Sequence, residues 1–338
     1  MADSPDISKA PRPTLKTIAR MTGLAVATVS RALHDADDLS AETKKRVREA
    51  AAKVGYRPNR AGVRLRTGKT NVISLVLSTD HDLMNHTARL ISSIAGAFRN
   101  TAYHLIITPY FADEDPMDPV RYIVETGSAD AVILNQTTPD DPRVAYLMEK
   151  AFPFATHGRT QWCDRHAYFD FDNTAFAHMA VAELHAQGRG NILLILPPLL
   201  QNYSMNLMDG AAEASQVFGV KTTVLQGATS DDPSDLIEAA TRQFLADNPD
   251  IDAILCASTI SCMAATAAAE NLGRVLGQDI DIAAKEAVSF LKQFRQPILT
   301  LNEDVAKAGA FLARATMQAI AKPEAAPMQF LDAPTKVG

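Results

Sequence analysis

The sequence predicts a small all-α domain of the helix-turn-helix type, followed by a larger α/β core in which parallel sheets form two lobes. Three observations support this division. Apolar residues recur at helical spacing in the first 58 residues, β-rich runs alternate with helical patterns after Asn71, and the net charge changes sign between the two parts. A length of 338 residues is enough for more than one hydrophobic core.

The charge is distributed unevenly along the chain. Residues 1–70 contain 15 Lys and Arg against 7 Asp and Glu, a net charge of +8. Residues 71–338 contain 18 basic and 32 acidic residues, a net charge of −14. This asymmetry favours a polyanion-binding module attached to an acidic body, and a basic surface that only faces solvent is the alternative.

Two short helices are expected at the start of the first domain. Ile18 and Ala19 mark the apolar side of one, Val29 and Ala32 mark that of the next, and Gly23 lies between them as a turn residue that tolerates positive φ. The second helix is suited to a major groove, where arginine reads guanine and aliphatic groups contact thymine methyls. The residues that would carry this contact are Ala25, Val26, Ala27, Thr28, Ser30 and Arg31. An ordinary helical hairpin is the alternative.

A third helix and a basic stretch follow. Ser40 can cap the helix through its hydroxyl, and Val47 and Ala51 can close a small three-helix core. In the next stretch, RPNRAGVRLRTGKTN, basic residues alternate with small ones around a lone Leu65. Phosphate contacts would account for the basic residues, and a leucine among arginines fits an apolar wedge between base steps in the minor groove.

From Thr14 to Ile73 these segments resemble the LacI/GalR family of bacterial transcription regulators. The resemblance implies that Val26, Ala27 and Arg31 read bases and that Leu65 intercalates from a hinge helix. Gly62 stands where the family usually has alanine. The motif and the resemblance together give the DNA-binding set Thr17, Ala25, Val26, Ala27, Thr28, Ser30, Arg31, Tyr56, Asn59, Arg60, Arg64 and Leu65. The expected order is a disordered tail over 1–13, a helix-turn-helix domain over 14–58, a hinge helix and linker over 59–70, and an effector-binding core over 71–338.

Eight β-rich runs, each followed by a helical or turn segment, predict parallel sheets in the core. They are VISLVLS, HLIITPY, DAVILNQ, FPFATHG, NILLILP, TTVLQG, DAILCAS and DIDIAA. The resemblance implies a periplasmic-binding-protein-like core with a ligand between its lobes. We expect the first lobe over about 71–170 and 301–324, and the second over about 171–300 and 325–338. A helix within 296–321 would pack on the first lobe, and MQFLDAP would return to the second.

Ligands of parallel sheets bind beyond the carboxyl ends of the strands, which nominates the polar residues found there. The predicted effector-binding residues are Asp80, Asn135, His157, Arg159, Asp172, Tyr203, Asn206, Thr259, Lys285 and Glu286. Carboxylates, amides and an arginine around an aromatic ring suit a hydroxyl-rich ligand, although polar caps at strand ends are the alternative for each position. Leu207, Thr259 and the pair Lys285–Glu286 depart from the family pattern. A carbohydrate is the expected effector because it is the commonest in the family.

No catalytic residues, metal ligands or cofactor sites are predicted. The sequence has no glycine-rich phosphate loop, HExxH or GxSxG motif, and its eight histidines do not pair at ligand spacing. Cys163, Cys256 and Cys262 are expected to be buried thiols in a reducing compartment. The sequence contains no long apolar run and begins without an export signal, so a cytoplasmic location is expected.

The favoured hypothesis is a repressor that acts as a homodimer or tetramer on double-stranded, pseudo-palindromic operator DNA and responds to a small effector. Activation of transcription by the same architecture is one alternative. A sugar-binding transport protein shares the two-lobed core, but the basic first domain opposes it. A sugar-modifying enzyme on the α/β core is a third class, and no motif supports it.

Overall fold

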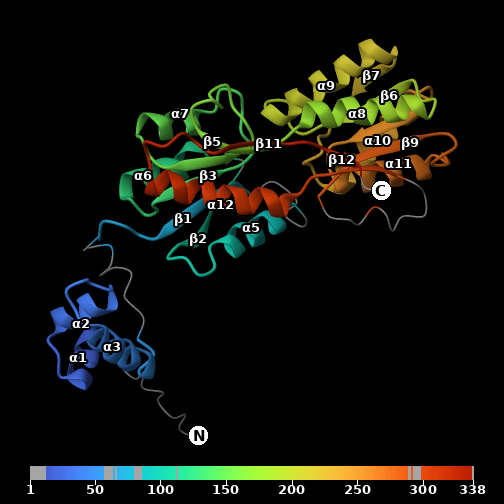
Figure 1. Cartoon of the computed structure of the whole chain (residues 1–338). Coiled ribbons are helices and arrows are strands. Elements are labelled where there is room, and N and C mark those ends of the chain that lie inside the picture. Colours follow the sequence, from blue (N-terminus) through green and yellow to red (C-terminus); the bar gives the residue numbers. More distant parts are fainter. Residues whose placement is uncertain are drawn as a thin grey trace, which may run out of the picture. The chain divides into compact units, whose positions relative to one another are not determined.

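The computed structural model describes residues 13–56, 64, 67–79, 86–111, 113–287, 291 and 298–336. It divides into two compact units, Met1–Thr70 and Asn71–Gly338 (Figure 1). The predicted tail over 1–13 and the predicted hinge over 59–70 lie largely outside the described residues. No helix in the described ranges is both long and apolar enough to cross a lipid bilayer.

Within residues 13–56 the first unit forms a three-helix bundle, as predicted. Its helices are α1 (Leu15–Thr22), α2 (Val26–Leu33) and α3 (Ala41–Lys53). Ile18, Val29 and Val47 contribute one fully buried side chain from each helix. The chain turns between α1 and α2 at Gly23, whose φ of 68° is favourable only for glycine among ordinary residues. The expected cap is also confirmed, because the Ser40 hydroxyl accepts a hydrogen bond from Thr43 N–H at the start of α3.

The second unit contains two sheets of six strands, and all eight strands predicted from the sequence are present. The first sheet has the order β11-β5-β4-β3-β1-β2, and the second has the order β12-β10-β9-β8-β6-β7. All strand pairs are parallel except β10 with β12. The strands are β1 (Val72–Ser78), β2 (His104–Tyr110), β3 (Ala131–Leu134), β4 (Phe154–His157), β5 (Ala167–Phe171), β6 (Asn191–Ile195), β7 (Lys221–Val224), β8 (Ala253–Cys256), β9 (Asp281–Glu286), β10 (Leu299–Asn302), β11 (Gln329–Asp332) and β12 (Thr335–Lys336).

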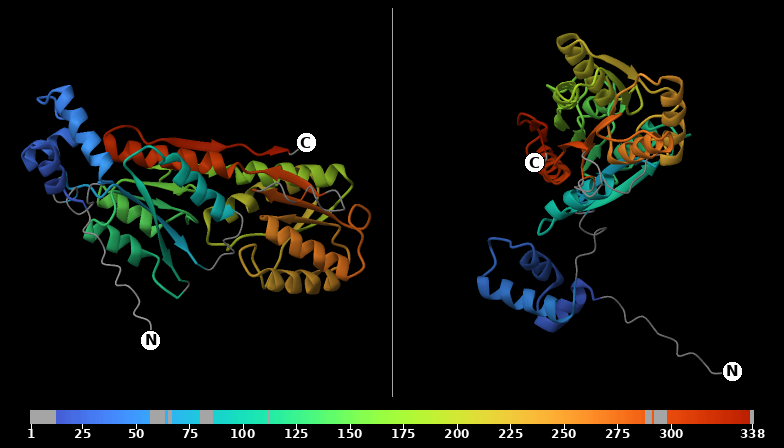
Figure 2. Two further views of the ribbon diagram at one scale, coloured as in Figure 1. Left: turned by 90° about the horizontal axis from the view of Figure 1, so that it is seen from below. Right: turned by 90° about the vertical axis from the view of Figure 1, so that its right-hand side faces the viewer.

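Helices cover both faces of each sheet, which explains why the inner strands β1, β3 and β8 are buried along their whole length. In β6, Ile192 and Leu194 pack under α8 and α9, whereas Leu193 and Ile195 pack under α10 and α11. In the first lobe, α5 and α12 lie side by side on one face and α6 and α7 cover the other (Figures 1 and 2). These helices are α5 (His86–Ala97), α6 (Met117–Thr126), α7 (Pro142–Glu149), α8 (Asn173–Ala186), α9 (Asn202–Phe218), α10 (Ser234–Asp247), α11 (Thr259–Asn271) and α12 (Val305–Ala321).

Within the described residues the chain passes between the lobes after β5, after β10 and after β11. The expected return of a helix to the first lobe is confirmed, because Leu312 of α12 is buried in the same cluster as Ile73 and Phe169. The expectation that MQFLDAP joins the second lobe is wrong. Gln329–Asp332 pairs with β5 at the edge of the first sheet, and only β12 returns to the second sheet. The connection from α12 is short, so the next strand adds to the nearest sheet edge.

Candidate functional site

The first candidate site is the outer surface of α2. Ala25, Val26, Ala27 and Arg31 are exposed, while Val29 on the opposite side is fully buried. The helix therefore presents small aliphatic groups and one guanidinium to solvent. Ala25 gives no side-chain cap to α2, so the first amides of the helix remain available to a phosphate.

The other predicted DNA-binding residues in the first unit are less exposed. Thr28, Ser30 and Thr17 are half-buried, and Thr17 forms a capping box with Thr14 at the start of α1. Tyr56 is half-buried against the three-helix core, where its N–H donates to the carbonyl of Ala51 at 2.9 Å. These side chains are therefore less accessible to a ligand than the exposed face of α2.

Arg31 is held by an acidic neighbour. Its guanidinium forms an ion pair with the exposed carboxylate of Asp38, in the loop between α2 and α3. Because both groups are exposed, the pair contributes little to stability and can exchange for a base edge or a phosphate. Of the predicted residues after Tyr56, Arg64 is exposed, and Asn59, Arg60 and Leu65 lie outside the described residues, as does Gly62.

The second candidate site is a cavity of about 180 Å³ between the lobes of the second unit. It lies beyond the carboxyl ends of the strands, as predicted for parallel sheets. The first lobe supplies polar residues that follow β3 and β4, and the second lobe supplies residues that follow β7 and β8. The lining residues are His86, Thr87, Asn135, Gln136, Thr137, His157, Gly158, Asp170, Phe171, Asn173, Tyr203, Ser230, Asp231, Asp232, Ala257, Ser258, Thr259, Ile260, Lys285, Ala287 and Glu303.

Five of the ten residues nominated from the sequence line this cavity. They are Asn135, His157, Tyr203, Thr259 and Lys285. The Oδ1 atom of Asn135 is buried without a hydrogen-bond partner among the described residues. A buried acceptor without a protein partner requires water or ligand, so this atom points to a polar occupant.

The other five nominated residues are not among the lining residues. Arg159 donates from Nε to Asp170 Oδ2 at 2.7 Å and so orients a carboxylate that does line the cavity. Asp172 caps α8 by accepting from Ala175 N–H at 3.0 Å. Glu286 is fully buried and accepts from Leu291 N–H. Asn206 lies further along α9, and Asp80 lies outside the described residues.

Sequence reasoning missed most of the acidic groups at the cavity. Asp231 and Asp232 follow β7, so the strand-end rule could have identified them in the segment ATSDD. Asp170 lies within β5, and Glu303 follows β10, in a segment from which only a helix on the first lobe was predicted. Tyr203 Oη donates to Asp231 at 3.2 Å, which fixes the aromatic ring at the cavity wall. Burial and the negative charge of Asp231 raise the pKa of Tyr203 well above its usual value.

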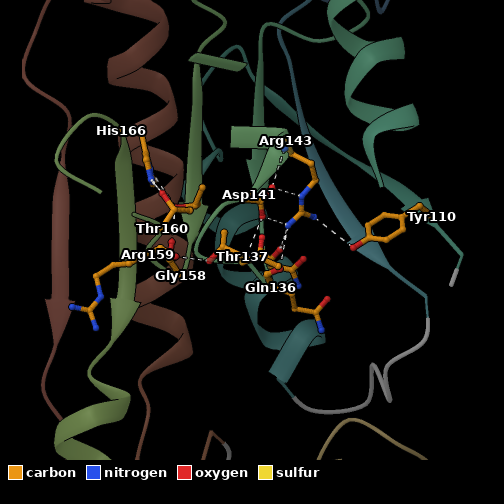
Figure 3. Close-up of polar contacts among 12 residues, drawn as sticks. Tyr110, Gln136, Thr137, Asp141, Arg143, Gly158, Arg159, Thr160 and His166 are labelled. Atoms are coloured by element: carbon orange, nitrogen blue, oxygen red, sulfur yellow. Dashed lines mark hydrogen bonds and ion pairs between the residues drawn. The ribbon is translucent and has the colours of Figure 1, made fainter. Parts of the chain in front are cut away.

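The loop that carries Asn135 to Thr137 is held by a buried ion pair. Arg143 donates from Nη2 to Asp141 at 2.7 Å and to the carbonyls of Asn135 and Gln136 at 3.2 and 3.1 Å (Figure 3). Thr137 Oγ1 donates to the carbonyl of Arg159 at 2.8 Å, which joins this loop to the end of β4. The guanidinium therefore supplies hydrogen bonds to two carbonyls in an irregular segment that would otherwise lack them.

One part of the cavity concentrates charged and ionisable groups. Glu303 Oε1 lies 3.2 Å from His86 Nε2, and its Oε2 lies 3.1 Å from Lys285 Nζ. Burial opposes ionisation of Glu303, but Lys285 and His86 outweigh it and hold the pKa of this carboxyl well below its usual range. Burial lowers the pKa of His157 to about 4, and burial raises the pKa of Asp170 to about 6. This side of the cavity is therefore strongly polar, whereas Phe171 and Tyr203 provide apolar surface.

Comparison with known proteins agrees with this architecture. The family described as bacterial regulatory proteins, lacI family, matches residues 14–59. The family described as periplasmic binding proteins and sugar binding domain of LacI family matches residues 71–331.

Named relatives and solved structures extend the comparison. The HTH-type transcriptional regulator AglR of Rhizobium meliloti (strain 1021) is 32% identical over 311 residues, which is 89% of this chain and 86% of AglR. RafR of Escherichia coli is 35% identical over 215 residues, covering 63% of this chain and 64% of RafR. The structure of the CelR–cellobiose complex is similar with a TM-score of 0.71 and 23% identity, covering 97% of this chain and 99% of CelR. The lac repressor dimer bound to operator and the anti-inducer ONPF gives a TM-score of 0.84 at 18% identity, covering 96% and 98% of the two chains.

A helix-turn-helix unit on a two-lobed α/β core with a polar cavity defines a class of ligand-binding transcription regulator. This chain belongs to the LacI family of HTH-type transcriptional regulators.

Proposed function

We propose that this regulator represses transcription as a homodimer on a pseudo-palindromic operator and that a small neutral carbohydrate in the interlobe cavity controls its affinity for DNA. The observation that carries the proposal is the exposed face of α2, which places Arg31 beside three small aliphatic residues in a matched helix-turn-helix unit. Arginine can form two hydrogen bonds to guanine, and alanine and valine can contact thymine methyls.

The composition of the cavity supports a neutral, hydroxyl-rich effector. Asp170, Asp231 and Glu303 offer carboxylate oxygens that accept hydrogen bonds from hydroxyls, and Tyr203 offers an aromatic face to an apolar sugar surface. Carboxylates outnumber cationic groups along the wall, which disfavours an acidic or phosphorylated ligand. The similar CelR structure in complex with cellobiose adds support for a small saccharide.

The proposed mechanism is a shift between conformations of the core. The lobes are connected by the three chain crossings and also by a hydrogen bond from Asn202 N–H to the carbonyl of Thr137 at 2.8 Å. A ligand that binds one lobe arrangement better than another shifts the population toward it. In a dimer, that shift would change how readily two recognition helices engage two half-sites together.

The decisive experiment for the DNA-binding part is an anisotropy titration of a labelled DNA fragment from upstream of the gene. Arg31→Ala is expected to weaken specific binding by about fivefold or more at each half-site, because a bidentate contact to guanine is worth roughly 1–3 kcal/mol. Arg121→Ala is the matched control, since it removes an exposed arginine from the second unit. Equal losses in the two variants would contradict the assigned role of Arg31.

A further inference from the structure

Three side chains of metal-ligating type meet at one wall of the interlobe cavity. His86 is the first residue of α5, His157 is the last residue of β4, and Glu303 follows β10. Their ligand atoms all lie within 4.8 Å of one another. Since His86 and Glu303 are 217 positions apart in the sequence, no spacing motif could have indicated this cluster.

Two of the three separations between the ligand atoms are close to those at a tetrahedral zinc ion. Ligands bound at about 2.0–2.2 Å on a tetrahedral ion lie roughly 3.3–3.5 Å from each other. Glu303 Oε1 lies 3.2 Å from His86 Nε2 and 3.7 Å from His157 Nε2. The two imidazole rings are stacked with centroids 5.3 Å apart, and the Nε2 atoms of both lie within 3.7 Å of the same Glu303 oxygen. Small side-chain adjustments would bring the three atoms to a common ion.

The arrangement leaves one coordination position toward the cavity. Glu303 is almost fully buried and His157 is mostly buried, but the His86 side chain is 38% exposed. All three residues line the cavity, which can hold water or a ligand at the fourth position. Two imidazoles and one carboxylate suit zinc, whereas calcium and magnesium prefer oxygen ligands.

Lys285 is the one cation inside this cluster among the described residues. Its Nζ lies 3.1 Å from Glu303 Oε2 as an ion pair, but Oε2 accepts no well-aligned hydrogen bond from the described residues. The ammonium also lies 3.3 Å from Asn173 Oδ1 and 5.2 Å from the centre of the Tyr203 ring. Lys285 therefore lies beside Glu303 Oε2, whereas Oε1 is the oxygen near the two imidazoles. The positive charge of Lys285 opposes the binding of a cation at the cluster.

We propose that His86, His157 and Glu303 form a Zn²⁺ site with an open coordination position in the interlobe cavity. The site joins the two lobes: the histidines belong to the first lobe, whereas Glu303 N–H donates to the carbonyl of Glu286 in β9 of the second lobe at 3.0 Å. Zinc bound here fixes one arrangement of the lobes and adds a metal-dependent input to the regulator. The site does not depend on the identity of the effector.

The test is calorimetric titration of the full chain, freed of metal with a chelator, with Zn²⁺ in the absence of DNA and sugar. One ion per chain is expected, and Co²⁺ in its place is expected to give the visible absorption bands of a four-coordinate site. His86→Gln should weaken zinc binding by at least about tenfold and remove the cobalt bands. His178→Gln changes a half-buried histidine of α8 outside the cluster and should leave both unchanged.

Lys285→Gln provides a test with the opposite sign. Removal of its charge should tighten zinc binding by at least about fivefold. This result would not occur for adventitious binding at surface histidines. Absence of saturable binding and of cobalt bands in the unsubstituted chain would overturn the proposal, and so would equal zinc affinity in the His86→Gln and His178→Gln variants. Because DNA is absent, either failure leaves the role in transcription untouched.

Discussion

At the scale of single residues, the cavity depends on side chains that do not touch its interior. Arg143 is 4% exposed, and its charge is balanced by Asp141, which is also buried. The same guanidinium binds the carbonyls of Asn135 and Gln136 (Figure 3). A buried pair of this kind is weak evidence for stability, but loss of one partner leaves an uncompensated buried charge.

Arg143→Gln is therefore expected to destabilise the core by about 3 kcal/mol or more, because Asp141 would lose its partner and two carbonyls would lose a donor. Chemical denaturation monitored by circular dichroism measures this change. Arg242→Gln is the matched control, since Arg242 pairs with Glu238 at an exposed position on α10. Comparable stability losses in the two variants would contradict the role assigned to the buried guanidinium.

A second residue-scale prediction concerns pH. His166 is 2% exposed, stacks on Phe154 and lies 2.9 Å from Thr160 Oγ1, and burial lowers its pKa below the ordinary value of 6.5. Near and below pH 6.5 the unfolded chain binds a proton that the folded chain excludes, so stability falls as the pH falls. Between pH 8 and pH 5.5, the melting temperature measured by calorimetry should fall less for His166→Gln than for the unsubstituted chain. An equal loss in both would refute the assignment.

At the scale of elements, helices α8 and α9 of the second lobe pack closely at a glycine of α9. Gly210 of α9 faces the first turn of α8, and a Cβ atom added there would collide with the carbonyl oxygen of Thr174. The neighbour is backbone, so it cannot rotate away as a side chain would. Since α9 also carries Tyr203 to the cavity, the spacing of these helices affects the candidate site.

Gly210→Ala should destabilise the second lobe by roughly 1–3 kcal/mol, the usual cost of overpacking. Gly96→Ala on α5 is the matched control, because Gly96 is exposed and an added Cβ has no neighbour within 4 Å. That change should be neutral or stabilising by up to about 1 kcal/mol. Denaturant midpoints of the two variants measure the contrast, and similar midpoints would contradict the packing argument.

The sequence predicted individual elements well where local chemistry determines them. Ser40 capped a helix as expected, Gly23 turned the chain with positive φ, and the first strand run was buried along its whole length in β1. The placement of β11 could not be predicted, because the partner of an edge strand depends on where α12 packs. The meeting of His86, His157 and Glu303 was also hidden, because it is created by folding of distant segments.

At the scale of the whole molecule, two units with opposite net charge hold the two candidate sites. The cavity belongs entirely to the second unit, and the exposed surface of α2 belongs to the first. Binding at one can influence the other only if each ligand binds one conformation of the protein more tightly than another. A substitution at Asn135 tests the contribution of the cavity to effector binding. Its Oδ1 has no hydrogen-bond partner among the described residues, so removal of that atom breaks no hydrogen bond that it makes within the protein.

The most direct measurement is the affinity of the full chain for its upstream operator over a series of sugar concentrations at fixed salt, with a saccharide first shown to raise the melting temperature. Coupling between the cavity and the DNA-binding unit should change the operator affinity by roughly 5- to 150-fold at saturation. The midpoint should move to about tenfold higher sugar in Asn135→Ala. Asn271→Ala, an exposed control on α11, should keep the original midpoint. An operator affinity that stays constant while the sugar saturates the core would contradict the account.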